Sequence, residues 1–289
     1  MNPVRSALYL PASNARALIK ARSLACDAVI LDLEDAVAPE AKISAREQAA
    51  AVLAEGFGDR IVVLRVNGLG TEWGREDLAM AVRAGPDVVL APKVDDAGAV
   101  DAYDAALGAA REALRLWAMI ETPAGVLRLP EIAACAGRTR LAGLVMGLND
   151  LALALRARWT PGRAAFTGAL QATVLAARAN GLLALDAVFN NLEDAAGLDA
   201  ECRQGRELGF DGKTVIHPRQ IETANAAFSP SAEEVAWAET VVQAFADPAN
   251  AGRGALRVGG AMVERLHLVE AEGLLGRHAR TLAGRACQA

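Results

Sequence analysis

Short apolar segments recur along the chain, and longer segments rich in Ala, Leu, Arg and Glu separate them. Most of the short segments do not alternate between apolar and polar residues, and Val, Ile and Leu dominate them. This pattern is typical of parallel strands that are covered on both faces. The eight predicted strands are residues 6–10, 28–33, 61–66, 88–91, 116–120, 144–146, 183–187 and 213–216.

The intervening segments have the spacing of amphipathic helices. In residues 13–25, apolar side chains recur at i, i+4 and i+7, and Ser13 or Asn14 is placed to cap the helix. Residues 167–180 have a similar pattern, and Gly181 follows as a helix terminator. No glycine-rich dinucleotide turn follows the first strand, so eight strand–helix units favour an α/β fold of the (β/α)8 TIM-barrel type over a doubly wound sheet.

A C-terminal segment lies outside the predicted barrel. We expect a TIM-barrel catalytic domain over residues 1–228 and a C-terminal helical lid extension over residues 229–289. Residues 231–246 are predicted as a helix, residues 247–260 as a loop rich in Gly and Arg, and residues 261–280 as a second helical stretch. The extension could be a lid, an oligomer contact or both, and the glycines at the entry to that stretch would suit a hinge.

Composition narrows the classes of function. The 289 residues are 53% hydrophobic and 22% charged, and the formal net charge is −5. An acidic chain without a basic block lacks the electrostatic footprint of a nucleic-acid-binding protein. The chain has no apolar run of membrane-spanning length and no secretory signal at its start, so we expect a cytoplasmic protein without a membrane partner.

Two carboxylates stand where a TIM barrel carries its active site, at the carboxyl ends of the strands. Glu121 and Asp150 each come just after the last apolar residue of successive predicted strands. Two hard oxygen ligands without His or Cys nearby suit Mg²⁺, with Mn²⁺ as the alternative. The spacing equally allows each carboxylate to cap a helix or to pair with an arginine.

Further polar residues follow the neighbouring strands. Arg65 has the geometry to hold a substrate carboxylate through two parallel hydrogen bonds, or it forms a salt bridge to Glu34 or Asp35. Glu34 and Asp35, in turn, orient metal-bound water or pair with Arg65. Lysine occurs at four positions, and among them Lys93 is the one placed to form a Schiff base, but the sequence gives it no partner.

Five motifs occur in order, and together they resemble one family. They are Arg5-Ser6-x-Leu8-Tyr9-x-Pro11, Leu31-Asp32-Leu33-Glu34-Asp35-Ala36-Val37, Arg65-Val66-Asn67, Glu121-Thr122-Pro123-x-Gly125 and the segment from Gly209 to Ile221. The chain is similar in these motifs to the citrate lyase β-subunit-like CoA-ester lyases of the HpcH/HpaI aldolase/citrate lyase superfamily.

The resemblance implies an activity and roles for individual residues. It implies a Mg²⁺-dependent carbon-carbon lyase that cleaves or forms a 3-hydroxyacyl-CoA, such as malyl-, citramalyl- or citryl-CoA, with acetyl-CoA and a 2-keto acid as the partners of that reaction. Glu121 and Asp150 would be the metal ligands, Arg65 and Glu121 would bind substrate, and Asp35 would act near metal-bound water with Glu34 beside it. A homo-oligomer, trimeric or hexameric, is implied as well.

One position departs from the family pattern. The family commonly carries a G-x-M-[IV]-D segment whose Asp reaches a neighbouring subunit's active site as an acid/base group, and the match here ends in Glu264. The additional methylene moves a carboxylate by about 1 to 1.5 Å, and a misplacement of that size costs on the order of 10²-fold in rate. We therefore treat Glu264 as a candidate acid/base residue that implies a shifted lid, a different substrate or reaction, or a low activity.

Other functions remain open from the sequence. The chain could be the β subunit of a citrate lyase complex that acts on an acyl-carrier-protein thioester. It could also be a class II pyruvate-type aldolase that acts on free hydroxy-keto acids, or a catalytically silent assembly protein.

Overall fold

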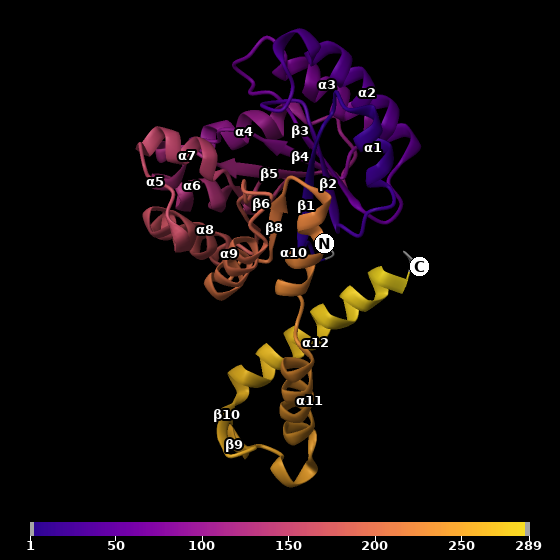
Figure 1. Cartoon of the computed structure of the whole chain (residues 1–289). Coiled ribbons are helices and arrows are strands. Elements are labelled where there is room, and N and C mark those ends of the chain that lie inside the picture. Colours follow the sequence, from indigo (N-terminus) through magenta and orange to yellow (C-terminus); the bar gives the residue numbers. More distant parts are fainter. Residues whose placement is uncertain (1–2, 287–289) are drawn as a thin grey trace. The chain divides into compact units, whose positions relative to one another are not determined.

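The computed structural model describes residues 3–286, so the predicted domain limits at residues 1 and 289 lie outside the described part of the chain. The chain divides into two compact units, one formed by Val4–Phe228 and the other containing the chain from Ser229 onward. Both units are labelled by their elements in Figure 1.

The first unit is a closed barrel of eight parallel strands, and β8 pairs with β1 to close it. This confirms the predicted fold class. The strand starts and ends agree with the predicted ones within about two residues, except that β6 begins at Leu141. The strands are β1 (Ser6–Pro11), β2 (Ala28–Asp32), β3 (Ile61–Arg65), β4 (Val88–Ala91), β5 (Arg115–Ile120), β6 (Leu141–Met146), β7 (Leu183–Asp186) and β8 (Gly212–Val215).

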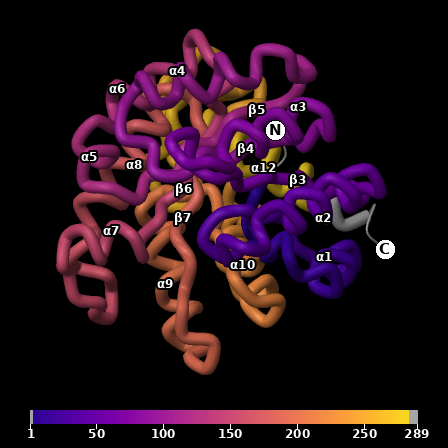
Figure 2. The backbone as a smooth tube through the Cα atoms, turned by 90° about the horizontal axis from the view of Figure 1, so that it is seen from above, coloured from indigo at the N-terminus to yellow at the C-terminus, as the bar shows by residue number. Residues whose placement is uncertain are grey.

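Helices surround this barrel, as the view from above shows (Figure 2). The first helix is shorter than predicted, and the Asn14 side chain caps it by accepting the Ala17 N–H at 3.1 Å. Within residues 3–286, no helix has both the length and the apolar character needed to cross a membrane. The helices of this unit are α1 (Ala15–Ala21), α2 (Lys42–Glu55), α3 (Gly74–Ala84), α4 (Ala97–Ala106), α5 (Pro123–Leu127), α6 (Leu129–Ala134), α7 (Leu148–Leu155), α8 (Thr167–Ala179), α9 (Ala195–Leu208) and α10 (Ile221–Ala227).

Both faces of the strands are buried, which explains why the sequence does not alternate. One apolar cluster, which includes Ile30, Val63, Leu90 and Trp117, fills the interior of the barrel. A larger cluster lies between the strands and the helices. The amphipathic helices therefore act as the outer layer of a two-layer core.

The pairing that closes the barrel is reinforced by side chains. Ser6, opposite Lys213 in the register, donates its hydroxyl to Asn225 Oδ1 at 2.7 Å. The Asn225 Nδ2 group donates to the main-chain oxygen of Ala25 at 2.7 Å. Helix α10, which carries Asn225, is thus tied to the start of the chain.

A buried ion cluster lies beside the last two strands. Asp186 and Lys213 have no exposed surface, and the Lys213 ammonium contacts Asp186 at 3.2 Å and Glu201 at 2.6 Å. Arg163 completes the cluster with a 2.7 Å contact to Asp186. Although burial opposes ionisation, the two cations hold the pKa of Asp186 below its usual value. Lys213 therefore has a structural role in this cluster.

The second unit contains a β-hairpin that the sequence prediction missed. Helix α11 (Ala232–Ala246) begins as predicted, but residues assigned to loop and helix form β9 (Ala255–Val258) and β10 (Ala261–Glu264) before α12 (Arg265–Ala286). The predicted helix from residue 261 is therefore wrong for its first four residues. Gly259 and Gly260 both have positive φ, 57° and 87°, as a two-residue hairpin turn requires.

Candidate active site

The loop after β2 folds around one buried carboxylate, that of Asp32. Arg65 donates to both of its oxygens, from Nε at 2.7 Å and from Nη2 at 2.6 Å. The same carboxylate accepts the main-chain N–H groups of Glu34 at 2.9 Å and Ala36 at 3.2 Å. Because Asp32 and Arg65 are opposite each other in the register of β2 and β3, the strand pairing itself places this ion pair.

Two further side chains fix the same loop. The Lys42 ammonium donates to the main-chain oxygens of Leu33 at 2.8 Å and Glu34 at 2.7 Å. Asn67, just after β3, donates to the Leu33 oxygen at 2.9 Å. These bonds satisfy buried main-chain groups and hold the Glu34 side chain at the mouth of the barrel.

Glu121 follows β5, and the residues after it start a helix in a defined way. The Thr122 hydroxyl accepts the Gly125 N–H at 3.0 Å, and Pro123 occupies the first helical position. A Cβ at Gly125 would lie 2.4 Å from the Val94 oxygen, so this turn requires glycine. The motif therefore serves to bring the chain sharply round and leave the Glu121 carboxylate at the strand end.

The start of α7 positions Asp150 and leaves space for the Glu121 side chain. Asp150 lies in the first turn of this helix, where the helix dipole favours a negative charge. Gly147 precedes the helix, and a Cβ there would lie 2.5 Å from Glu121 Cβ and 2.6 Å from Glu121 Oε2. The absence of a side chain at position 147 is what makes space for the Glu121 carboxylate.

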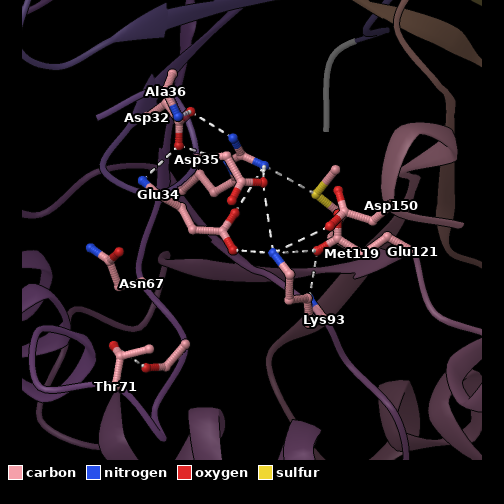
Figure 3. A network of polar contacts seen from close by, with 12 residues as sticks. Asp32, Glu34, Asp35, Ala36, Asn67, Thr71, Lys93, Met119, Glu121 and Asp150 are labelled. Atoms are coloured by element: carbon pink, nitrogen blue, oxygen red, sulfur yellow. Dashed lines mark hydrogen bonds and ion pairs between the residues drawn. The ribbon is translucent and has the colours of Figure 1, made fainter. Parts of the chain in front are cut away.

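Lys93 lies at the centre of the carboxylates (Figure 3). Its ammonium is 2.5 Å from Glu34, 3.6 Å from Asp35, 3.9 Å from Glu121 and 3.7 Å from Asp150. Its main-chain N–H donates to Glu121 Oε1 at 2.8 Å, and its φ of 50° is in the left-handed region that non-glycine residues rarely adopt. A strained residue at such a point is a marker of a functional site.

The charges of the cluster do not balance. Five carboxylates, on Asp32, Glu34, Asp35, Glu121 and Asp150, form ion pairs with two cations, Arg65 and Lys93. The Lys42 ammonium adds a third positive charge that interacts with Asp32, Glu34 and Asp35. Burial raises the pKa of Glu121 to about 8, although the Lys93 charge opposes the shift, and burial also raises the pKa of Glu34. Carboxylates that outnumber the cations around them, one of them holding a proton up to about pH 8, are suited to a divalent cation that would displace this proton.

The donor set fits a hard divalent cation. Glu121 is fully buried, and its Oε2 has no hydrogen-bond partner among the described residues. A buried carboxylate oxygen of this kind is costly unless a ligand satisfies it. Within the described chain, no group of three or more His, Cys, Asp or Glu side chains is arranged to hold a metal ion. Two carboxylates with open positions suit a cation that keeps water or substrate oxygens.

The structure brings together most of the residues that the sequence singled out. Glu34, Asp35, Glu121 and Asp150 all belong to the cluster of Figure 3, and Arg65 forms ion pairs with Glu34 and Asp35 of that cluster. Both branches of the Arg65 fork that could take a substrate carboxylate are filled by Asp32, and its Nη1 lies 3.0 Å from Glu34 and 3.7 Å from Asp35.

Glu264 belongs to the second unit, at the end of β10. Its side chain is exposed, and its main-chain N–H donates to His267 Nδ1 at 2.8 Å. Its role as an acid/base group stays a prediction.

The role of three residues of the cluster escaped the sequence analysis. Asp32 and Gly147 organise the cluster, yet neither was named as a site residue, and Lys93 was considered only as a Schiff-base lysine, not as a partner of the carboxylates. A signal existed for Asp32, because it ends its strand beside the strand that ends in Arg65. For Lys93 and Gly147 the signal is a backbone conformation and a distance, which the sequence does not display.

A cavity of about 680 Å³ lies in the first unit, at the loops that follow α7 and β7. Trp159 and Phe189 contribute aromatic surface, and Asn190 contributes an amide. Asn190 is bonded to Asn149, the neighbour of Asp150, through its Nδ2 at 2.7 Å. This wall of the cavity is therefore connected to the helix that carries Asp150.

Comparisons with known proteins show the family to which this chain belongs. The family model for HpcH/HpaI aldolase/citrate lyase matches residues 5–218. A (3S)-malyl-CoA thioesterase of Cereibacter sphaeroides is 48% identical over 286 residues, which are 99% of this chain and 98% of that protein. The citrate lyase subunit beta of Escherichia coli is 35% identical over 268 residues, which are 90% and 88% of the two chains.

A solved structure is similar over nearly the whole chain. The protein CitE from Mycobacterium tuberculosis, in complex with magnesium, acetoacetate and coenzyme A, has a TM-score of 0.79 and 32% sequence identity. The similarity covers 96% of this chain and 98% of that chain.

Proposed function

Because the chain belongs to the HpcH/HpaI aldolase/citrate lyase family, we propose that it is a Mg²⁺-dependent enzyme that acts on a 3-hydroxyacyl-CoA of the malyl-CoA type. The observation that carries the substrate class is the similarity, over almost the full length of both chains, to a (3S)-malyl-CoA thioesterase. The buried and unpaired Oε2 atom of Glu121 supports the metal within the described chain.

Glu121 and Asp150 would hold the metal, and Mn²⁺ is the alternative ion. A bound Mg²⁺ supplies charge that holds the hydroxyl and carboxylate oxygens of the substrate and stabilises negative charge that develops on them. Arg65, whose Nη1 is paired with Glu34 at 3.0 Å, would contribute positive charge near the substrate carboxylate and not a two-bond clamp. The thioester arm would lie in the cavity lined by Trp159 and Phe189.

Two reactions of such a thioester fit these residues. The first is hydrolysis, favoured by the 48% identical relative. Water adds to the thioester carbonyl, Asp35 accepts a proton from that water, the C–S bond breaks, and the leaving thiolate takes up the proton. Asp35 suits this step because its side chain is 54% exposed and can reach solvent.

The second reaction is the carbon-carbon cleavage predicted from the sequence, which the citrate lyase relatives favour. Here Asp35 accepts the proton of the substrate hydroxyl, the Cα–Cβ bond breaks, and a 2-keto acid and a thioester enolate form. Glu264 of a neighbouring subunit would protonate the enolate carbon to give acetyl-CoA.

One assay separates the two reactions. The isolated chain is incubated with malyl-CoA and Mg²⁺, and free thiol, malate, glyoxylate and acetyl-CoA are measured together. Thiol with malate means hydrolysis, whereas glyoxylate with acetyl-CoA and no thiol means carbon-carbon cleavage. Citramalyl- and citryl-CoA serve as parallel substrates. Turnover that survives EDTA in a metal-free preparation would contradict the metal dependence.

The remaining alternatives need separate tests. Turnover of free CoA esters by the isolated chain would argue against a requirement for an acyl-carrier-protein thioester. Turnover of free hydroxy-keto acids at a rate equal to that of the CoA esters would favour the class II aldolase. Light scattering would test the predicted trimer or hexamer, in which Glu264 would serve a neighbouring site.

A further inference from the structure

The Lys93 ammonium lies where the carboxylates of the proposed metal site converge. Its distances of 3.9 Å to Glu121 and 3.7 Å to Asp150 place one positive charge beside both proposed ligands. We propose that Lys93 is an internal counter-ion that competes with the divalent cation for Glu121 and Asp150, and that cation binding shifts it fully to Glu34 and Asp35. This inference rests on the proposed function, since it concerns the same site.

The contacts of Lys93 are unequal, and this gives the shift its direction. The short contact is to Glu34, at 2.5 Å, while those to the two proposed ligands are longer than 3.5 Å. The side chain is 43% exposed, so solvent rather than packed atoms surrounds much of it. Lys93 can therefore leave the proposed ligands without losing its closest partner.

Of the two cations that form ion pairs with these carboxylates, Lys93 is the one able to move away. Arg65 is 7% exposed, is held through two bonds by Asp32, and lies over the ring of Tyr9. A lysine side chain is a flexible point charge, whereas a doubly bonded guanidinium is fixed in its plane. An incoming cation would repel both positive charges, and Lys93 is the group free to move in response.

The main chain and the side chain of Lys93 have separable roles. Its N–H donates to Glu121 Oε1 at 2.8 Å, while its ammonium offsets part of the negative charge of the cluster. Replacement by Met keeps the N–H and the length of the side chain but removes the charge. The variant Lys93→Met therefore tests the counter-ion alone.

Arg111→Met is a matched control. Arg111 pairs with Asp87 at 2.8 Å, and both side chains are about half exposed. They lie just before β5 and β4, at the opposite end of the barrel from the carboxylates. The substitution changes the net charge by the same amount without touching the cluster, so it corrects for long-range electrostatic effects.

The experiment is a calorimetric titration of each full-length, metal-free protein with MgCl2, together with thermal unfolding with and without Mg²⁺. We expect Lys93→Met to bind Mg²⁺ about fivefold more tightly than the unsubstituted protein, the size expected when one partly exposed ion pair no longer competes. The Tm of the metal-free variant should fall, and the rise in Tm on adding Mg²⁺ should become larger. Arg111→Met should bind as the unsubstituted protein does.

Each other outcome is informative. Unchanged or weaker Mg²⁺ binding by Lys93→Met, while the unsubstituted protein binds, overturns the competition and leaves the proposed function intact. Failure of both proteins to bind Mg²⁺ overturns the metal site and this inference together. If Lys93 had a purely structural role, Lys93→Met would lower the Tm by the same amount with and without Mg²⁺. If Lys93→Met does not fold, Lys93→Gln removes the charge while keeping a polar end.

Discussion

Gly147→Ala is a substitution of one methyl group whose effect can be worked out from distances. The added Cβ would lie 2.5 Å from Glu121 Cβ, whereas ordinary contacts begin at 3.4 Å, so the two atoms must separate by about 0.9 Å. Because Glu121 Cβ is bonded directly to the main chain, no rotation of its side chain relieves this contact. The ends of β5 and β6 have to move apart, and the Glu121 carboxylate moves with them.

The expected cost has two parts. Overpacking of a buried site lowers the free energy of unfolding by about 1–3 kcal/mol, which leaves a typical domain folded. Displacement of a metal ligand by nearly 1 Å should weaken Mg²⁺ binding by about 10- to 100-fold and lower turnover by on the order of 10²-fold.

Urea unfolding measures the first part, and calorimetry with MgCl2 measures the second. Gly168→Ala is the control, because a Cβ on this α8 residue would have no atom within 4 Å. It should keep the Mg²⁺ affinity and gain about 0.5 kcal/mol in the free energy of unfolding. Gly147→Ala protein with unsubstituted stability and affinity would refute the contact argument.

Three other perturbations have defined outcomes. Glu121 has a pKa of about 8 in the folded, metal-free protein against 4.5 as its ordinary value, so the folded state holds a proton that the unfolded chain has released between these values. The contribution of Glu121 to the free energy of unfolding of the metal-free protein should therefore be fully present below about pH 4.5 and be lost as the pH rises to about 8. Over the same range, the Mg²⁺ affinity should rise by up to tenfold per pH unit and level off above about pH 8. Urea unfolding and calorimetry across pH would show neither trend if Glu121 were ionised throughout. Asp186→Asn removes the negative charge between the buried Arg163 and Lys213, so it should lower the free energy of unfolding, measured with urea, by about 3–5 kcal/mol. A decrease below about 1 kcal/mol would be inconsistent with this ion cluster. Glu264→Gln should slow carbon-carbon cleavage, measured by glyoxylate release, and unchanged turnover would eliminate its acid/base role.

The barrel could be predicted because the pattern of apolar and polar residues along the chain reflects which faces of its strands and helices are buried. Strands buried on both faces have to be continuously apolar, and helices on one face have to be amphipathic. The site residues followed from the same rule, since the last residue of a parallel strand must lie at one end of the barrel. Glu121 and Asp150 were therefore found from position alone.

The hairpin was missed although its signal was present. Gly259 and Gly260 stand between segments in which Leu256, Val258 and Val263 have the alternation of half-buried strands. The helical pattern that follows extended the predicted helix back over β10. A two-residue glycine turn between alternating segments should have taken precedence over propensity.

The centre of the cluster could not be predicted, for a different reason. The strand ends place Asp32 opposite Arg65, but which of Asp32, Glu34 and Asp35 takes the two short bonds of the guanidinium depends on how the loop after β2 folds. Lys93 reaches the carboxylates because its backbone adopts a left-handed conformation that nothing in its side chain favours. Tertiary contacts, and not local preference, decide both positions.

The pairing of β1 with β8 has a consequence for folding during synthesis on the ribosome. The register Ser6 to Lys213 joins segments separated by about two hundred residues, so β1 emerges from the ribosome long before its second partner. Until β8 is made, an incomplete barrel carries two open edges that invite pairing with other chains. Contacts so distant in sequence form slowly. The segment from Ser229 onward is synthesised after β8, and this gives the barrel time to close while the nascent chain is still tethered to the ribosome.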